Sequence, residues 1–305
     1  MLFPTKTAKE KRQLLQDKLK QNKILQFPGA FSPLVSMLIE DLGFDGIYVS
    51  GAVLSNDLAL PDIGLTTLTE VSQRGRDIAR ASSLPSIIDV DTGFGEPMNL
   101  VRSIQELTEL GLSGCHLEDQ INPKRCGHLD NKSLVSVEQM TKKIKAAASA
   151  KTDPNFLLIA RTDSRASEGF SKSVDRAKAY IDAGADMIFP EALQDEKEFE
   201  EFKKQINAPV MANMTEFGKS PILTKNQLQD MGYSLVIYPV TTLRLAMKAV
   251  EDGLKHIKST GDQKDIVSNM QERKRLYEIL KYKDYENFDK DIFNFDLKNN
   301  KKGNK

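Results

Sequence analysis

The sequence predicts a (β/α)₈ barrel, because eight short apolar segments alternate with longer amphipathic segments between residues 24 and about 258. Near-continuous apolarity, as in residues 156–160, is typical of parallel strands that are buried on both faces. A doubly wound open sheet is the alternative architecture. The predicted strands are 24–28, 46–50, 86–90, 114–118, 156–161, 186–190, 209–213 and 234–238.

Signals for the start and end of helices lie between these segments. Thr67 with Glu70, and Thr224 with Gln227, have the spacing of capping boxes at helix starts. Glycines favour helix ends because they adopt left-handed backbone conformations, and they stand at the expected positions Gly43, Gly111, Gly184 and Gly232.

The chain is interpreted as a single catalytic domain over residues 1–305. An extra N-terminal helix is expected within 1–22, opened by Thr7 and Glu10, before the barrel at 23–260. An amphipathic helix is expected at 261–283, and the Lys- and Asn-rich segment 284–305 reads as a polar tail.

Composition excludes several classes of partner. The 43 Lys and Arg residues balance the 43 Asp and Glu residues, so nothing indicates a nucleic-acid partner. Two cysteines do not suggest a disulfide framework. The charged N-terminus does not resemble a secretory signal, and no apolar run approaches the roughly 20 residues of a membrane span. We therefore expect a soluble, cytoplasmic protein.

Acidic residues end the third and fourth predicted strands, where barrel enzymes carry their catalytic groups. Asp89 and Asp91 project to the same side of a strand, and such buried carboxylates repel each other unless a cation lies between them. Glu118 adds an acid from the next strand. An oxygen-only set favours Mg²⁺, with Mn²⁺ as the alternative, although solvated loop acids or helix caps would explain each residue alone.

The loop 124–128 reads Lys-Arg-Cys-Gly-His and surrounds a thiol with positive charge. Such surroundings favour the thiolate, so Cys126 could act as an acid or base near neutral pH. Gly127 would let the loop move as a lid. Cys115 lies within an apolar strand and is expected to be inert.

Further polar residues follow the other strands. Arginine matches a carboxylate with two parallel hydrogen bonds, and amide and hydroxyl groups complete an anion-binding rim. Each residue alone would more simply be a cap or an ion-pair partner, but together they indicate a site for a metal and a small polycarboxylate. They are Tyr48, Ser50, Gly51, Ala52, Arg161, Glu191, Asn213, Thr215 and Arg244.

Four segments, 89–95, 124–128, 161–163 and 213–218, resemble the isocitrate lyase/phosphoenolpyruvate mutase superfamily, and the likeness runs from about residue 27 to about 273. Within it the 2-methylisocitrate lyases are most similar. Isocitrate lyases usually carry Lys-Lys-Cys-Gly-His, are longer, and place tryptophan near 188–192, whereas this chain has none. Ala52 departs from the glycine of many relatives.

The resemblance implies cleavage of 2-methylisocitrate to pyruvate and succinate in propionate breakdown, through the methylcitrate cycle. It implies that Asp89, Asp91 and Glu118 hold Mg²⁺, some of them through water. Cys126 would be the general acid with His128 beside it, and the base stays open between Tyr48 and Glu191. Substrate contacts would come from Ser50, Gly51, Ala52, Lys124, Gly127, Arg161, Asn213, Thr215, Arg244 and Arg273.

The resemblance also implies a homotetramer in which the C-terminal helix is exchanged between subunits. The alternatives are isocitrate lyase activity or cleavage of another 2-hydroxy polycarboxylate such as 2,3-dimethylmalate, since one methyl group gives only about 1–3 kcal/mol of discrimination. Phosphonopyruvate or oxaloacetate chemistry is a second alternative, and the Cys126 loop argues against it. A non-catalytic protein that binds a metal and a carboxylate is the third.

Overall fold

Eight parallel strands close into a barrel in the computed structural model, which describes residues 5–125, 127 and 132–293. Hydrogen bonds join the strands in the orders β1-β8-β7 and β2-β3-β4-β5-β6. Parallel bridges between Gly29 and Tyr48 and between Ile188 and Val210 connect these two sets, so the barrel prediction is confirmed over an open sheet. The strands are β1 (Leu25–Pro28), β2 (Ile47–Val49), β3 (Ser86–Asp89), β4 (Gly114–Glu118), β5 (Leu157–Thr162), β6 (Met187–Pro190), β7 (Met211–Asn213) and β8 (Leu235–Tyr238).

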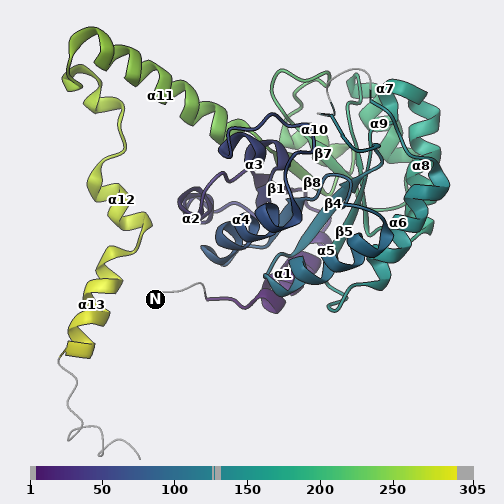
Figure 1. Cartoon of the computed structure of the whole chain (residues 1–305), viewed down its shortest axis with the longest axis horizontal. Coiled ribbons are helices and arrows are strands. Elements are labelled where there is room, and N and C mark those ends of the chain that lie inside the picture. Colours follow the sequence, from purple (N-terminus) through teal and green to yellow (C-terminus); the bar gives the residue numbers. More distant parts are fainter. Residues whose placement is uncertain (1–4, 126, 128–131, 294–305) are drawn as a thin grey trace, which may run out of the picture.

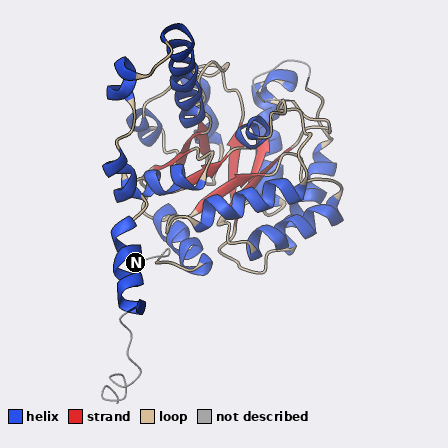
Figure 2. Cartoon of the chain, turned by 60° about the vertical axis from the view of Figure 1, so that its left-hand side comes forward, coloured by secondary structure: helices blue, strands red, loops and turns tan. Residues whose placement is uncertain are grey.

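Helices surround the strands on the outside, as Figure 2 shows. The capping boxes predicted at Thr7, Thr67 and Thr224 are all formed, and an unpredicted one opens α6 at Ser136. All four glycines predicted to end helices have positive φ angles. The helices that cover the barrel are α1 (Ala8–Leu19), α2 (Pro33–Asp41), α3 (Gly51–Asp57), α4 (Leu68–Arg80), α5 (Pro97–Glu109), α6 (Val137–Ser149), α7 (Arg165–Glu168), α8 (Phe170–Asp182), α9 (Glu196–Gln205) and α10 (Lys225–Asp230).

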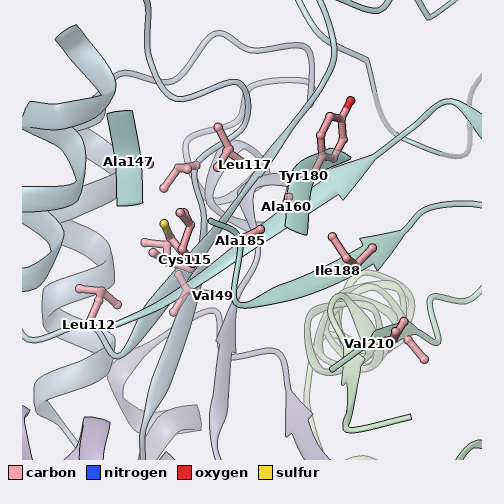
Figure 3. Close-up of a cluster of buried hydrophobic side chains, with 14 of the residues drawn as sticks. Val49, Leu112, Cys115, Leu117, Ala147, Ala160, Tyr180, Ala185, Ile188 and Val210 are labelled. Carbon is pink, nitrogen blue, oxygen red and sulfur yellow. The ribbon is translucent and has the colours of Figure 1, made fainter. Parts of the chain in front are cut away.

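The hydrophobic core has two parts because successive side chains of a strand point to opposite faces. Cys115 and Leu117 of β4 belong to the layer between the strands and the outer helices, together with Ala147 of α6 and Tyr180 of α8 (Figure 3). The other part fills the barrel interior and includes Phe27, Tyr48, Ile87, Ile159, Met187, Phe189, Met211 and Ile237. Residues that alternate with Cys115 and Leu117 therefore face the barrel axis.

The C-terminal segment leaves the barrel as an arm made of α11 (Thr241–Thr260), the 3₁₀ helix η1 (Lys264–Asn269), α12 (Arg273–Ile279) and α13 (Tyr282–Phe293). It lies beside the barrel in Figure 1, and an ion pair between Arg275 and Asp41 ties α12 to α2. None of the residues of α11 is buried. The helix that follows β8 therefore does not cover the barrel of its own chain.

Two sequence-based boundaries differ from the structure of this arm. The helix expected at 261–283 is divided into η1 and α12, and the polar tail expected from 284 was wrong for residues 284–293, which belong to α13. Tyr285, Phe288 and Ile292 recur at helical spacing in α13, which explains its form. In the described ranges, no helix combines the length and apolarity needed to cross a membrane.

Candidate active site

The carboxyl ends of the strands bring most of the predicted residues together at one mouth of the barrel. Asp89, Glu118, Arg161 and Asn213 each stand two positions beyond a residue that faces the barrel interior. One small cavity is lined by Tyr48, Ser50, Ala52, Asp62, Asp89, Lys124, Gly127, Arg161, Phe189, Glu191, Asn213, Thr215, Pro239 and Val240.

The Asp89 carboxylate is fixed by two backbone N–H groups. The N–H of Gly51 donates to Oδ2 at 3.3 Å, and the N–H of Asp91 donates to Oδ1 at 3.0 Å. Asp91 adopts a left-handed φ of 48°, which turns the chain back so that its carboxylate also faces Gly51. A Cβ on Gly51 would lie 2.9 Å from Asp89 Oδ2 and 3.1 Å from Asp91 Oδ1, so a glycine is required for this close approach.

Two acids at this mouth, Asp91 and Glu118, are destabilised in their charged form. Burial, together with the neighbouring Asp89, raises the pKa of Asp91 to about 6. Burial also raises the pKa of Glu118 well above its usual range, although Arg161 opposes the shift. Both carboxylates would therefore gain from additional positive charge.

The donor set fits a divalent cation. Neither Glu118 carboxylate oxygen accepts a well-aligned hydrogen bond from the described residues, although both atoms are buried. A buried carboxylate without donors is costly unless a cation compensates it, and an all-oxygen set suits Mg²⁺ or Mn²⁺. In the described ranges, no group of three or more His, Cys, Asp or Glu side chains is arranged so that it could hold a metal ion.

Lys124 supplies positive charge to the same cluster. It is buried, its Nζ lies 2.9 Å from Asp91 Oδ1, and it also contacts Asp62 Oδ1. Burial opposes its charge, but Glu118 and the three aspartates outweigh burial and raise the pKa of Lys124. Asp62 was missed by the sequence analysis, because it lies after α3 and not directly at the end of a strand. The available signal was an acidic residue in the segment between the second and third strands.

Arg161 is surrounded by three carboxylates. Its Nε and Nη2 donate to the two oxygens of Asp163 at 2.9 and 3.1 Å, and Glu118 and Glu191 each lie 3.3 Å away. The guanidinium also lies 5.2 Å from the centre of the Phe189 ring. This arrangement holds one planar donor group in the cavity wall, where it can bind a further carboxylate.

The side of the mouth near β7 and β8 carries amide, hydroxyl and arginine groups. Asn213 Nδ2 donates to Glu191 at 3.3 Å. Arg244 Nη1 lies 3.4 Å from Thr215 Oγ1 and 2.5 Å from Glu216 Oε2. Asn213, Thr215 and Arg244, which were predicted, therefore lie on the same side of the mouth. Arg244 also pairs with Glu216, which was not predicted.

Tyr48 and His116 form a buried pair that the sequence analysis recognised only in part. Tyr48 Oη lies 2.6 Å from His116 Nε2, and the two rings are stacked. Burial raises the pKa of Tyr48 well above 10 and lowers the pKa of His116 to about 4, so both are neutral at pH 7. The signal for His116 was its place on β4, two residues before Glu118 and on the same inward face.

Three predicted residues are not among the described residues of the cluster. Cys126 and His128 lie outside the described residues. Arg273 is exposed on α12 in the arm and does not line the cavity of its own chain. Cys115 is fully buried, and burial raises the pKa of its thiol, as expected of an inert cysteine.

Comparison with known proteins identifies the family of the chain. The family described as phosphoenolpyruvate phosphomutase matches residues 15–258. Two Corynebacterium glutamicum proteins named probable 2-methylisocitrate lyases 2 and 1 are 53% and 54% identical; the alignments cover 94% and 93% of this chain, and 93% and 94% of those proteins. The chain belongs to the phosphoenolpyruvate mutase/isocitrate lyase superfamily. The 2-methylisocitrate lyase of Bacillus subtilis is 46% identical over 88% of this chain and 89% of that protein.

Solved structures of the superfamily share the fold. A 2,3-dimethylmalate lyase has a TM-score of 0.86 at 27% identity, covering 95% of this chain and 96% of that chain. A phosphonopyruvate hydrolase in complex with oxalate and Mg²⁺ has a TM-score of 0.83 at 29% identity, covering 93% of this chain and 99% of that chain. The predicted resemblance is therefore confirmed over nearly the whole chain.

Proposed function

We propose that this protein is a Mg²⁺-dependent 2-methylisocitrate lyase, which cleaves 2-methylisocitrate to pyruvate and succinate in propionate breakdown. The observation that carries the proposal is a barrel mouth with a carboxylate cluster and three cationic side chains, in a chain 53–54% identical to relatives named for this activity. Isocitrate lyase activity is not favoured, because many similar relatives are named 2-methylisocitrate lyase.

The cationic groups suit a substrate with three carboxylates. Arg161 offers paired N–H donors, Lys124 offers a buried ammonium group, and Arg244 stands at the rim next to Thr215. Ser50, Gly51, Ala52, Gly127 and Asn213 complete the proposed contacts. Because Asp62, Asp89 and Asp91 surround Lys124, only part of its charge remains for the substrate.

Asp89, Asp91 and Glu118 would hold the metal in this proposal. Bound Mg²⁺ supplies positive charge that stabilises the oxygen of the emerging pyruvate carbonyl. The two backbone hydrogen bonds to Asp89 and the close approach of Gly51 would keep these carboxylates oriented toward the substrate.

The chemistry needs one base and one acid. The base takes the proton of the substrate hydroxyl while the bond between the carbinol carbon and the neighbouring CH carbon breaks. The electron pair of that bond passes to the succinate fragment, and Cys126 returns a proton to its carbon, with His128 beside it. Tyr48 and Glu191 remain the two candidates for the base, and Tyr48 Oη lies 2.6 Å from His116 Nε2.

The proposal includes a cytoplasmic homotetramer that exchanges the C-terminal arm. α11 exposes Met247, Val250, Leu254 and Ile257, which recur on one face of the helix and need a partner surface. Exchange would also bring Arg273 to the mouth of another subunit. Light scattering of the purified protein tests the mass, since a subunit of 34.1 kDa should be found as a tetramer and a monomer would reject the exchange.

The activity is tested by incubating the purified protein with 2-methylisocitrate and Mg²⁺. Pyruvate would be followed through lactate dehydrogenase and succinate by NMR. Both products should form in equal amounts, disappear when EDTA is added, and return with excess Mg²⁺. Absence of both products with Mg²⁺ and with Mn²⁺ would reject the proposed function.

A further inference from the structure

Lys132 is a buried cation that follows the loop 124–128 and has no role in the proposed reaction so far. Its side chain is 1% exposed. Its Nζ lies 3.0 Å from Asp163 Oδ1 and donates to the carbonyl oxygen of Gly127. A buried ammonium group is stable only with such partners, so these contacts fix where Lys132 can lie.

Asp163 connects Lys132 to Arg161. Its Oδ1 accepts both the Lys132 ammonium and Arg161 Nη2, at 3.0 and 3.1 Å, while Oδ2 accepts Arg161 Nε at 2.9 Å. The backbone of Asp163 is fixed in turn, because its N–H donates to Asp119 Oδ1 at 2.9 Å. One carboxylate therefore pairs with two cations.

Gly127 completes the arrangement from the other side. A Cβ at this position would lie 2.4 Å from Arg161 Nη2, 2.5 Å from Glu191 Cγ and 2.8 Å from Asp163 Oδ1. The Gly127 backbone thus packs directly on the Arg161–Asp163 pair, and its carbonyl faces Lys132. Gly127 is also the covalent neighbour of Cys126.

We propose that Lys132 is a positioning residue for the cleavage reaction. Its ammonium group holds the Gly127 carbonyl beside the Arg161–Asp163 pair, so that the backbone next to Cys126 and the guanidinium of Arg161 keep one relative arrangement. This inference rests on the proposed function, because it assumes the roles of Cys126 and Arg161. The described contacts of Lys132 are with Gly127 and Asp163, and not with the proposed base candidates.

The balance of charge around Arg161 also supports a positioning role for Lys132. Arg161 faces Asp163, Glu118 and Glu191, so it is one cation among three carboxylates. Lys132 shares the charge of Asp163. Without Lys132, Asp163 would interact more strongly with Arg161. Less of the guanidinium charge would then be available to a substrate carboxylate.

The test replaces Lys132 with Met, which keeps the length of the chain and removes the charge. Lys142→Met is the matched control, because Lys142 is 65% exposed and pairs with Glu138 across one helical turn. The measurements are kcat and KM for 2-methylisocitrate, the rate at which iodoacetamide alkylates Cys126, and the thermal unfolding midpoint. Cys115 is fully buried and should not react in the native protein.

We expect K132M to lower kcat by about 10- to 100-fold, with KM changed by less than about threefold. The rate of Cys126 alkylation should also change, while the unfolding midpoint stays near that of the wild type. Lys132→Arg keeps the charge and should recover part of kcat. K142M should match the wild type in every measurement.

Two results would overturn the inference. One is K132M with the kcat and the alkylation rate of the wild type. The other is equal loss of activity and of thermal stability in K132M and K132R, which would make Lys132 a purely structural residue. If the wild-type protein does not cleave 2-methylisocitrate, the proposed function fails, and the alkylation rate still decides whether Lys132 positions the backbone next to Cys126.

Discussion

Glu118 and Arg161 occupy paired positions on the neighbouring strands β4 and β5, with 3.3 Å between Glu118 Oε2 and Arg161 Nε. Both side chains face the barrel axis because each lies two residues beyond a buried inward position. The proposed metal ligand and the proposed substrate-binding arginine are therefore held in register by the hydrogen bonds of the sheet. The strand pairing, which needs no ligand to form, thus preorganises the site.

Arg161→Lys is expected to lower kcat/KM by about 100-fold, or about 2.7 kcal/mol. Lysine keeps the charge but cannot donate two parallel hydrogen bonds to Asp163 while facing Glu118 and Glu191. Steady-state kinetics measure the effect. Arg165→Lys is the control, because Arg165 pairs with Glu198 outside the cavity. Similar losses in both variants would mean that the Arg161 effect is not specific to the site.

Gly51→Ala is expected to weaken Mg²⁺ binding by about tenfold. The added methyl group would lie 2.9 Å from Asp89 Oδ2 and 3.1 Å from Asp91 Oδ1, so the two carboxylates would have to move. Isothermal titration calorimetry with Mg²⁺ measures the affinity. Gly253→Ala is the control, since its Cβ would meet only Ile266 Cδ1 at 3.7 Å. Wild-type affinity in G51A would separate Gly51 from the metal site.

The buried His116 makes stability depend on pH. Burial lowers its pKa from 6.5 to about 4, so the unfolded chain binds this proton more tightly than the folded protein. The contribution of His116 is therefore constant above pH 6.5 and is lost as the pH falls from 6.5 toward 4. The unfolding free energy of wild type minus that of His116→Gln should fall by on the order of 2 kcal/mol between pH 7 and pH 5. A difference independent of pH would contradict a neutral, buried His116.

The sequence predicted the barrel well because each strand and helix has its own local signal. β4 was predicted with its observed bounds, and the capping box at Thr67 placed the start of α4. The arm could not be predicted in the same way. The apolar face of α11 looks in sequence like that of a helix covering its own barrel, and only the structure shows that none of its residues is buried.

The site was predictable where chemistry coincides with a strand end, as for Asp89 and Arg161. Asp62 and Lys132 were not found, because they lie in loops and reach the site only through tertiary contacts. His116 was hidden for a different reason. A histidine between Cys115 and Leu117 reads as part of an apolar strand unless the alternation of its faces is followed.

Cys126→Ser is expected to retain Mg²⁺ and substrate binding but to lose most of kcat, by roughly 100-fold or more. A serine hydroxyl is a far weaker acid than a thiol, so it would protonate the succinate fragment slowly. Calorimetry measures binding, and rapid-quench kinetics measure the cleavage step. An unchanged kcat would remove Cys126 from the mechanism.

The most direct test of the central claim is the ratio of kcat/KM values for 2-methylisocitrate and isocitrate, measured in parallel with saturating Mg²⁺. The account predicts pyruvate and succinate from 2-methylisocitrate, with the ratio in its favour by about tenfold or more, since one methyl group corresponds to about 1–3 kcal/mol. Faster formation of glyoxylate from isocitrate would contradict it and would make the protein an isocitrate lyase on the same barrel.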